Sequence, residues 1–237
     1  MPRRRHDAEW MDRDGNSAAD VEAALRDLSL VNRFLGGSAS VLAAADRFLL
    51  EIPEGGTLDV LDVGSGGGDV SSALVRRGQE RGRSVRVVAV DRDGAAASYA
   101  RRALGAGGAF RVLRADAFAL PFRERSFDLV VASLFLHHFR HGEAVELLRR
   151  FLALARRAVV VSDLRRHVLP WAFIAVAARV TRRHPIFVHD APLSVLRGFT
   201  GDELRRAALD AGCPRPRVDR CWPYRLVLVA PAEAPAP

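Results

Sequence analysis

Lysine is absent from the sequence, so all 36 basic residues of the 237-residue chain are arginine. The formal net charge is +8, but apart from the run Arg3–Arg5 the arginines are spread along the chain and alternate with acidic residues. A continuous basic stripe, which marks a nucleic-acid-binding surface, is not evident. The missing lysine is typical of a genome-wide coding bias, and we expect no nucleic-acid partner.

Cysteine is scarce, and Cys213 and Cys221 lack the C-x-x-C spacing of a zinc or redox site. We expect them to be reduced, structural thiols. Long hydrophobic runs are also missing: the longest, Val168–Val180, is interrupted by a proline and an arginine and is too short to span a hydrocarbon core of about 30 Å. Residues 1–15 are charged throughout and lack the apolar segment of a signal peptide. These absences predict a cytoplasmic protein without stable membrane insertion.

Glycine, by contrast, is concentrated in one turn within residues 58–74, LDVLDVGSGGGDVSSAL. An apolar strand there leads into Gly64, Gly66 and Gly68, and a helix is expected from Asp69. Glycines allow positive φ and a close approach of a ligand to the backbone, while the first N–H groups of a helix point toward that ligand. The pattern predicts a nucleotide-type cofactor loop; a plain strand-to-helix connection is the alternative.

The acidic residues around this turn narrow the choice of cofactor. The dinucleotide fingerprint G-x-G-x-x-G needs a glycine where this chain has Asp69, and Asp62 precedes the turn. Two carboxylates disfavour a pyrophosphate and suit a ligand that carries an ammonium and a sulfonium. Asp91 ends the next apolar strand, at the distance expected for a carboxylate that accepts both ribose hydroxyls. Its alternative role is the N-cap of the next helix, for which Asp93 is equally suited.

The order of apolar segments predicts an α/β fold. Expected strands at 57–63, 84–90, 110–114, 127–133 and 158–162 alternate with expected helices at 69–80, 94–104 and 142–155. This alternation predicts a Rossmann-like parallel sheet with helices on both faces. Two further strands, 216–221 and 224–229, are joined too tightly to be parallel, so we expect a C-terminal antiparallel hairpin.

The chain ends lie outside this expected domain of residues 57–230. Residues 1–56 contain two expected helices, about 17–35 and 38–50, and form an N-terminal helical extension. Residues 164–199 form an insertion after the fifth strand, and 231–237 are expected to be a disordered tail.

Several motifs, taken in order, make the chain resemble the class I S-adenosylmethionine-dependent methyltransferases. The first motif of that family is similar to Val60–Gly68, VLDVGSGGG, and its acidic second position falls on Asp91. Its adenine-edge aspartate falls on Asp116 and its fourth strand on Phe127–Ser133, FDLVVAS. The resemblance implies S-adenosylmethionine as cofactor. The cofactor-binding residues that it implies are Asp62, Gly64, Ser65, Gly66, Gly68, Asp91, Arg92, Asp116, Ala117, Phe118, Ser133 and Leu134.

Shorter segments resemble small-molecule members of the family. LHHF at 136–139 is similar to quinone-biosynthesis C-methyltransferases, and NRFLGG at 32–37 and VHDAPLSVLRGFT at 188–200 resemble phenolic O-methyltransferases of polyketide pathways. This implies methyl transfer to the hydroxyl of a small aromatic acceptor in secondary metabolism. C-methylation of an aromatic ring, or a cofactor-binding protein that no longer methylates, are the alternatives. The resemblance also implies that residues 1–56 act as a lid; a helical layer packed on the sheet is the alternative.

Histidines are the candidate bases for such a reaction. A phenol has a pKa near 10, so a base that removes its proton in the transition state contributes roughly 10²–10⁴-fold. His138 and His137 follow the fourth strand, and His189 stands beside Asp190 in an expected proline-rich loop. We expect one of these three to be the base, with a capping or packing role as the alternative for each.

The acceptor pocket is expected near the insertion. His141, Trp171, Ile174 and Phe187 are its candidate contacts, because apolar residues cluster there. A buried helix, a homodimer surface or a membrane-surface helix are alternatives for this segment. The histidine pairs lack an acidic ligand at helical spacing, which favours a reaction that needs no metal ion.

Overall fold

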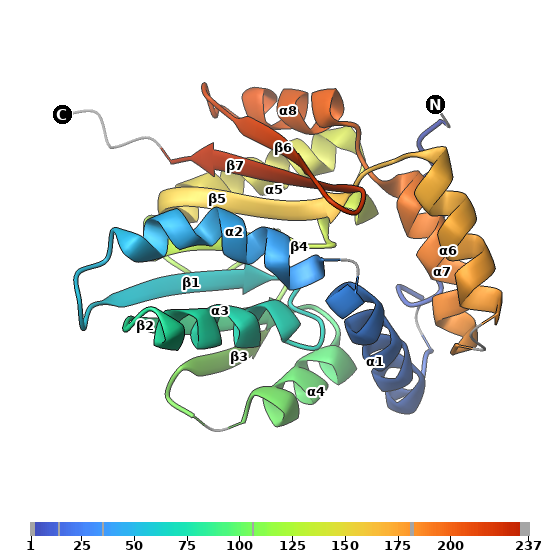
Figure 1. Cartoon of the computed structure of the whole chain (residues 1–237), viewed down its shortest axis with the longest axis horizontal. Coiled ribbons are helices and arrows are strands. Elements are labelled where there is room, and N and C mark those ends of the chain that lie inside the picture. The colour runs from blue at the N-terminus through green and yellow to red at the C-terminus, as the bar shows by residue number, and fades with distance from the viewer. Residues whose placement is uncertain (1–2, 14, 35, 106, 181–182, 233–237) are drawn as a thin grey trace.

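The computed structural model describes residues 3–13, 15–34, 36–105, 107–180 and 183–232. Its centre is a seven-stranded sheet in the order β3-β2-β1-β4-β5-β7-β6 (Figure 1). The strands are β1 Thr57–Val63, β2 Ser84–Asp91, β3 Phe110–Arg114, β4 Phe127–Ser133, β5 Ala155–Leu164, β6 Arg217–Cys221 and β7 Arg225–Pro231.

Strands β1 to β5 are parallel to one another, whereas β7 is antiparallel to both of its neighbours, β5 and β6. Residues 222–224 join β6 to β7, a connection too short for a parallel crossover. The predicted fold class, a parallel Rossmann-like sheet with a C-terminal antiparallel hairpin, is therefore confirmed. β5 is longer than expected, since it begins at Ala155 and ends at Leu164.

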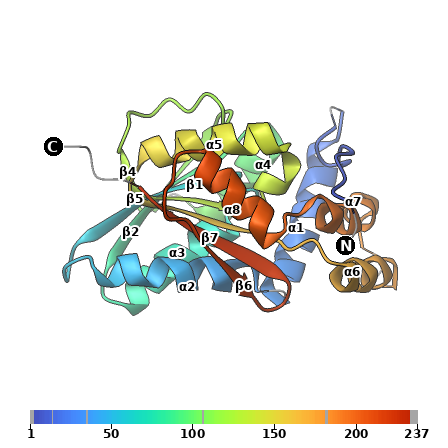
Figure 2. The ribbon, with the colours of Figure 1, turned by 90° about the horizontal axis from the view of Figure 1, so that it is seen from above.

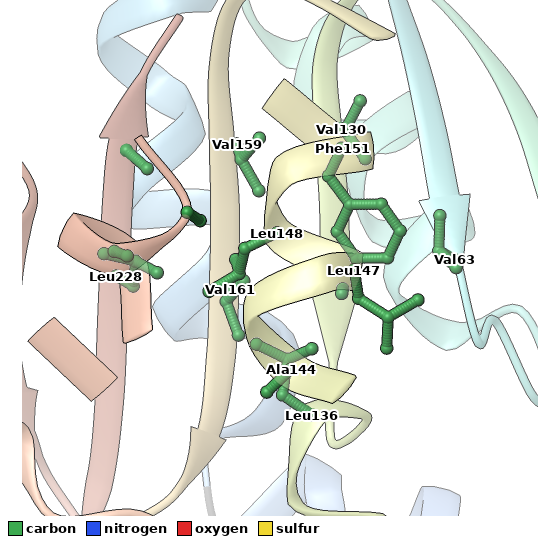
Figure 3. Packing of buried hydrophobic residues seen from close by; sticks show 14 of the residues in the cluster. Val63, Val130, Leu136, Ala144, Leu147, Leu148, Phe151, Val159, Val161 and Leu228 are labelled. Atoms are coloured by element: carbon green, nitrogen blue, oxygen red, sulfur yellow. The ribbon is translucent and has the colours of Figure 1, made fainter. Parts of the chain in front are cut away.

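Helices cover both faces of the sheet, which explains why the central strands are apolar throughout. α5 (His141–Leu154) and α8 (Gly201–Asp210) lie on one face, and α2 (Gly37–Leu50) and α3 (Asp69–Glu80) lie on the other (Figure 2). Figure 3 shows side chains of α5 packed against β4 and β5. Among them, Leu147, Leu148 and Phe151 are fully buried, and truncating any one of them to alanine would cost about 2–5 kcal/mol.

Three further helices gather at the carboxyl ends of the parallel strands, whereas α4 (Gly94–Leu104) lies along β2 and β3. α1 (Ala18–Phe34), α6 (Val168–Val180) and α7 (Pro185–Arg197) lie beyond the arrowhead of β1 (Figures 1 and 2). α4 packs against α1 through a small apolar cluster. The strand order reverses between β1 and β4, and open α/β sheets bind ligands in the crevice outside such a switch point.

One element differs from its expectation. The segment around His189 is not a proline-rich loop, because residues 185–197 form the helix α7. Pro185 occupies the first turn, where a missing N–H costs no helical hydrogen bond, and Pro192 lies inside the helix and is buried. Prolines alone were therefore a misleading signal here.

The two N-terminal helices lie in different places. α2 packs on the sheet against α3, β5 and β7, whereas α1 lies at the carboxyl edge against α4 and α7. Among the helices of the described residues, none combines the length and apolar character that crossing a bilayer requires. Of the expected C-terminal tail, Pro231 still belongs to β7, and residues 233–237 lie outside the described residues.

Candidate functional site

The glycine turn between β1 and α3 is bound to the end of β2. The N–H groups of Gly64 and Ser65 donate to the carbonyl of Val90 at 2.8 and 3.0 Å. Gly64 has φ +68°, and a Cβ added there would lie 2.2 Å from the ring of Phe135. Only glycine fits both this backbone conformation and this space. We call the turn of residues 64–68 the glycine cradle, because at its glycines no side chain covers the backbone.

Asp91, at the end of β2, holds the turn from the other side. Its Oδ2 accepts the N–H of Gly66 at 2.9 Å, and its Oδ1 accepts the N–H of Asp93 at 3.0 Å. Burial raises the pKa of Asp91, although these two hydrogen bonds oppose the shift. Asp93 is the N-cap of α4, because its Oδ1 accepts the N–H of Ala96 at 2.7 Å. Asp91 is therefore not needed as a cap.

Asp62 is buried beneath the turn, with 1% of its surface exposed. Burial raises its pKa to about 6; the hydroxyl of Ser71, which donates to Oδ2 at 2.6 Å, opposes this shift, and the nearby charge of Asp91 adds to it. A buried carboxylate with so high a pKa is stabilised by a cation placed beside it.

A cavity of about 70 Å³ lies between these residues and α1. Six of the predicted cofactor residues line it: Asp62, Gly64, Ser65, Gly66, Ser133 and Leu134. α1 contributes Leu25, Leu28 and Asn32, none of which was predicted from the sequence as a site residue. Leu25 and Leu28 belong to the apolar face of α1, so the signal was present, but the sequence did not show what that face covers.

The other predicted cofactor residues lie around this cavity. Gly68, with φ +83°, is the N-cap of α3. Arg92 is exposed and its guanidinium lies 3.6 Å from Asp12. Asp116, Ala117 and Phe118 follow β3, where Asp116 Oδ1 accepts the N–H of Phe118 at 2.9 Å. These three residues are at the carboxyl edge beside β2, beyond the lining of the cavity.

His137 belongs to the short 3-10 helix η1 (Leu136–His138), which follows β4. Its ring atom Nδ1 lies 2.7 Å from Oδ1 of Asp163, and its backbone N–H donates to Oδ2 of Asp163 at 2.9 Å. Asp163 lies near the end of the neighbouring strand β5 and is fully buried. Burial alone would raise the pKa of Asp163, but the charge and hydrogen bonds of His137 outweigh it and hold that pKa below its usual value.

His138 has a carboxylate partner of its own. Its Nδ1 lies 2.9 Å from Oδ2 of Asp12. Burial alone would lower the pKa of His138, but the hydrogen bond with Asp12 and the charge of Glu9 outweigh it and raise that pKa. The ring planes of His137 and His138 are tilted by 32° with centroids 4.3 Å apart. The two histidines therefore form one cluster with the acidic residues around them.

Glu9 and Asp12 reach this cluster from residues 3–13, which we call the N-terminal strap. The strap crosses η1 and α7: the N–H groups of Trp10 and Met11 donate to Asp190 at 2.8 and 2.9 Å, and Arg4 donates to the carbonyl of Phe139 at 2.9 Å. Neither acidic residue was predicted from the sequence to belong to the site. No periodicity or spacing connects the strap with η1, which is more than 120 residues away in the chain.

The remaining candidate residues lie outside the cluster. The ring of His189 stacks on Trp10 with centroids 4.1 Å apart, and its Nδ1 is 2.7 Å from Asp190. His141 is exposed and pairs with Asp210 at 3.1 Å. In the insertion, Trp171 is exposed on α6, Ile174 is half-buried and Phe187 of α7 is buried. The structure thus brings His137 and His138 together and separates them from His141.

Comparison with known proteins agrees with this geometry. Residues 60–158 match the model of a family described as a methyltransferase domain. No curated protein sequence matches the chain significantly.

Solved structures with the same fold share little sequence identity. A SAM-dependent methyltransferase from Aquifex aeolicus superposes with TM-score 0.62 at 17% identity, covering 92% of this chain and 100% of its own. Human N-acetylserotonin methyltransferase has TM-score 0.65 at 17% identity, covering 92% of this chain and 57% of its own. Magnesium protoporphyrin IX methyltransferase from Synechocystis PCC 6803 has TM-score 0.54 at 18% identity, covering 94% and 91%.

Residues 60–158, about two fifths of the chain, match a methyltransferase domain, and the fold resembles that of solved methyltransferase structures. The matched domain and the shared fold support S-adenosylmethionine as the cofactor and methyl transfer as the activity. The bare cradle and the buried Asp62 fit such a cofactor, because they leave room for close backbone contact and offer a negative charge to its ammonium.

Proposed function

We propose that the protein methylates a hydroxyl group of a small aromatic acceptor, with a histidine of η1 as the base. One observation carries this proposal: His138, with Asp12 on its Nδ1, ends the short helix η1 that follows β4, and Ser133 and Leu134, at the end of β4 and the start of the same connection, line the cofactor cavity. A nucleophile-activating base needs a second group that fixes its orientation, and Asp12 supplies it.

His138 is the better candidate of the pair because an acceptor can reach it. Its side chain is 23% exposed, against 3% for His137. In both rings a carboxylate at Nδ1 favours the tautomer that carries its proton there, which leaves Nε2 as the basic nitrogen. His137 and Asp163 then hold η1 in place. His189 is less suited to the role, since its ring is stacked on Trp10.

The cofactor cavity suggests how the donor is held. In this proposal Asp62 binds the ammonium of the cofactor, the glycine turn lies against its methionine part, and Asp91 accepts the ribose hydroxyls. The carboxylate of Asp91 already accepts two N–H groups, but four lone-pair sites leave capacity for the ribose. In the same proposal Asp116 and Phe118, which follow β3 beside β2, contact the adenine.

α1 supports the proposal of an N-terminal lid. Its Leu25 and Leu28 close the cavity to about 70 Å³, far below the roughly 300–1,000 Å³ of ligand pockets. α1 is held mainly from outside the sheet, by Ala96 of α4 and by Asp27, which accepts the N–H of His184 at 2.8 Å. We propose that α1 moves outward when the cofactor enters and then covers it. α2, packed on the sheet, is not part of this movement.

The bound cofactor supplies an activated methyl group, so the protein must chiefly align an acceptor and remove its proton. Partly buried aromatic rings stand beside the histidines: Phe135 and Phe139 contact edge-on with centroids 4.9 Å apart. These rings favour an aromatic acceptor held by apolar contact. We place the reaction in the cytoplasm, with no membrane or nucleic-acid partner.

Mass spectrometry with isotope-labelled cofactor and a panel of phenols tests the proposal. We expect product heavier by one labelled methyl group, and NMR should place that methyl on oxygen. A methyl on ring carbon would replace the proposal with C-methylation. Unlabelled acceptors throughout the panel, despite tight cofactor binding, would favour a protein that binds the cofactor without methylating.

A further inference from the structure

Glu9 lies between the two histidines of η1. Its Oε1 is 3.6 Å from Nε2 of His137, and its Oε2 is 4.0 Å from Nε2 of His138. Both distances exceed that of a hydrogen bond. One donor atom from each of the three residues lies within 4.8 Å of the others. Two imidazole nitrogens and a carboxylate therefore converge on one small space.

Both rings are oriented from behind by carboxylates. Asp163 contacts Nδ1 of His137 at 2.7 Å, and Asp12 contacts Nδ1 of His138 at 2.9 Å. Metal-binding histidines almost always have such a partner, which fixes the tautomer and raises the basicity of the free nitrogen. This second observation is independent of the convergence of the donor atoms.

We propose that Glu9, His137 and His138 form a binding site for a divalent ion of the zinc class. Two imidazoles favour zinc, cobalt, nickel or copper over magnesium and calcium, which prefer oxygen ligands. A tetrahedral ion with bonds of about 2.0–2.1 Å needs donor atoms roughly 3.4 Å apart. The three donor atoms lie within 4.8 Å of one another, so an ion would draw them together by up to about 1.4 Å.

The charges around the cluster act in both directions. The guanidinium of Arg197 lies 3.7 Å from Oε1 of Glu9 and opposes a cation, and Oγ of Ser194 lies 2.9 Å from the same oxygen. The carboxylates of Asp12 and Asp163 favour a cation through the rings that they contact. His138 is partly exposed and provides the side from which an ion can enter.

An ion at this position would fasten the N-terminal strap to η1, because Glu9 belongs to the strap and both histidines belong to η1. It would also occupy Nε2 of His138, the atom that the proposed function assigns to the base. Metal binding and proton removal by His138 then exclude each other. We therefore expect a zinc-class ion to inhibit methyl transfer reversibly, and a chelator to preserve or restore it.

Cobalt provides a direct readout that does not depend on activity. Untagged, chelator-treated protein is titrated with Co²⁺ and followed by visible absorption. We expect bands that saturate at one equivalent and disappear when Zn²⁺ is added. Glu9→Gln should weaken Co²⁺ binding by more than tenfold, and Asp12→Asn by about 10–100-fold, since losing an orienting partner typically costs that much.

His141→Asn is the matched control, because His141 also pairs with a carboxylate but lies on the exposed start of α5. Its titration should equal that of the wild type. Wild-type protein without saturable bands, or equal binding by the Glu9→Gln and Asp12→Asn variants when circular dichroism shows both folded, would overturn the site. Asp12 is exposed, so its variant keeps the test informative if Glu9→Gln does not fold.

The test separates this inference from the proposed function. Saturable Co²⁺ binding with no methylated product supports the metal site and counts against the acceptor assignment. Methylated product without saturable Co²⁺ binding supports the proposed function and overturns the metal site. Protein that binds Co²⁺ at one equivalent but is not inhibited by Zn²⁺ would overturn the exclusion between the ion and the base.

Discussion

The carboxylate of Asp163 holds His137 at two points, the ring nitrogen Nδ1 at 2.7 Å and the backbone N–H at 2.9 Å. Since Asp163 ends a buried stretch of β5 and His137 is the middle residue of η1, this contact ties η1 to the sheet. Breaking a buried pair of this kind by removing one partner costs several kcal/mol. The position of His138, one residue further, depends on it.

His138→Ala should lower kcat by about 10²–10⁴-fold, the contribution typical of a general base. Affinity for S-adenosylhomocysteine should stay within a factor of a few, because His138 lies outside the lining of the cofactor cavity. Steady-state kinetics and calorimetry measure the two quantities. Unchanged kcat would remove His138 from the mechanism and leave alignment, or another histidine, to account for the rate.

Asp91→Ala should weaken cofactor binding by roughly 100-fold. The two ribose hydroxyls lose the charged carboxylate to which they donate, and the N–H of Gly66 loses its acceptor. Asp93→Ala is the matched control: it removes the N-cap of α4, costs about 1 kcal/mol of stability and should leave affinity nearly unchanged. Calorimetric titration with S-adenosylhomocysteine compares them. Equal affinity in both variants would refute the role of Asp91.

Asp62→Asn should stabilise the protein at neutral pH. The pKa of Asp62 is about 6 in the fold against about 3.9 unfolded, so the folded state binds more protons and stability falls as pH rises from about 4 to 6. The variant lacks this loss. The unfolding free energy of the variant minus that of the wild type should grow by a few kcal/mol between about pH 4 and pH 6 and stay constant at higher pH. Urea unfolding at pH 4 and 7.5 measures it; a pH-independent difference contradicts the shift.

Gly64→Ala should destabilise the protein more than Gly55→Ala. Both glycines have positive φ, +68° and +73°, and share a backbone cost of about 1–2 kcal/mol. At Gly55 an added Cβ meets no described atom within 4 Å, but at Gly64 it collides with Phe135. The additional loss of stability in Gly64→Ala, compared with Gly55→Ala, comes from the collision with Phe135. Adding Phe135→Ala to Gly64→Ala should remove that collision. If the two single variants have the same Tm, the cradle is not as closely packed as the structure shows.

The positions of residues that follow from local spacing were predicted from the sequence. The glycine turn, Asp62 and Asp91 stand at strand ends, where the alternation of strands and helices places them at one edge of the sheet. The C-terminal hairpin was predicted from a two-residue connection, 222–223; in the structure the connection is residues 222–224. In each case the local pattern and the global fold agree.

Residues that meet only through tertiary contacts could not be predicted in this way. Glu9 and Asp12 lie in a charged segment without periodicity, and only the folded strap brings them to His137 and His138. α7 was expected to be a loop because proline breaks a helix in most positions. Here the first turn of the helix tolerates Pro185, and Pro192, inside the helix, is buried by packing.

The most direct test of the account is the product formed from a phenolic acceptor and S-adenosylmethionine labelled with ¹³CD₃. We predict a phenolic ether that carries the intact label, formed by the wild type and strongly reduced in His138→Ala. A label on ring carbon, or no labelled product from protein that binds the cofactor, would contradict the proposed function.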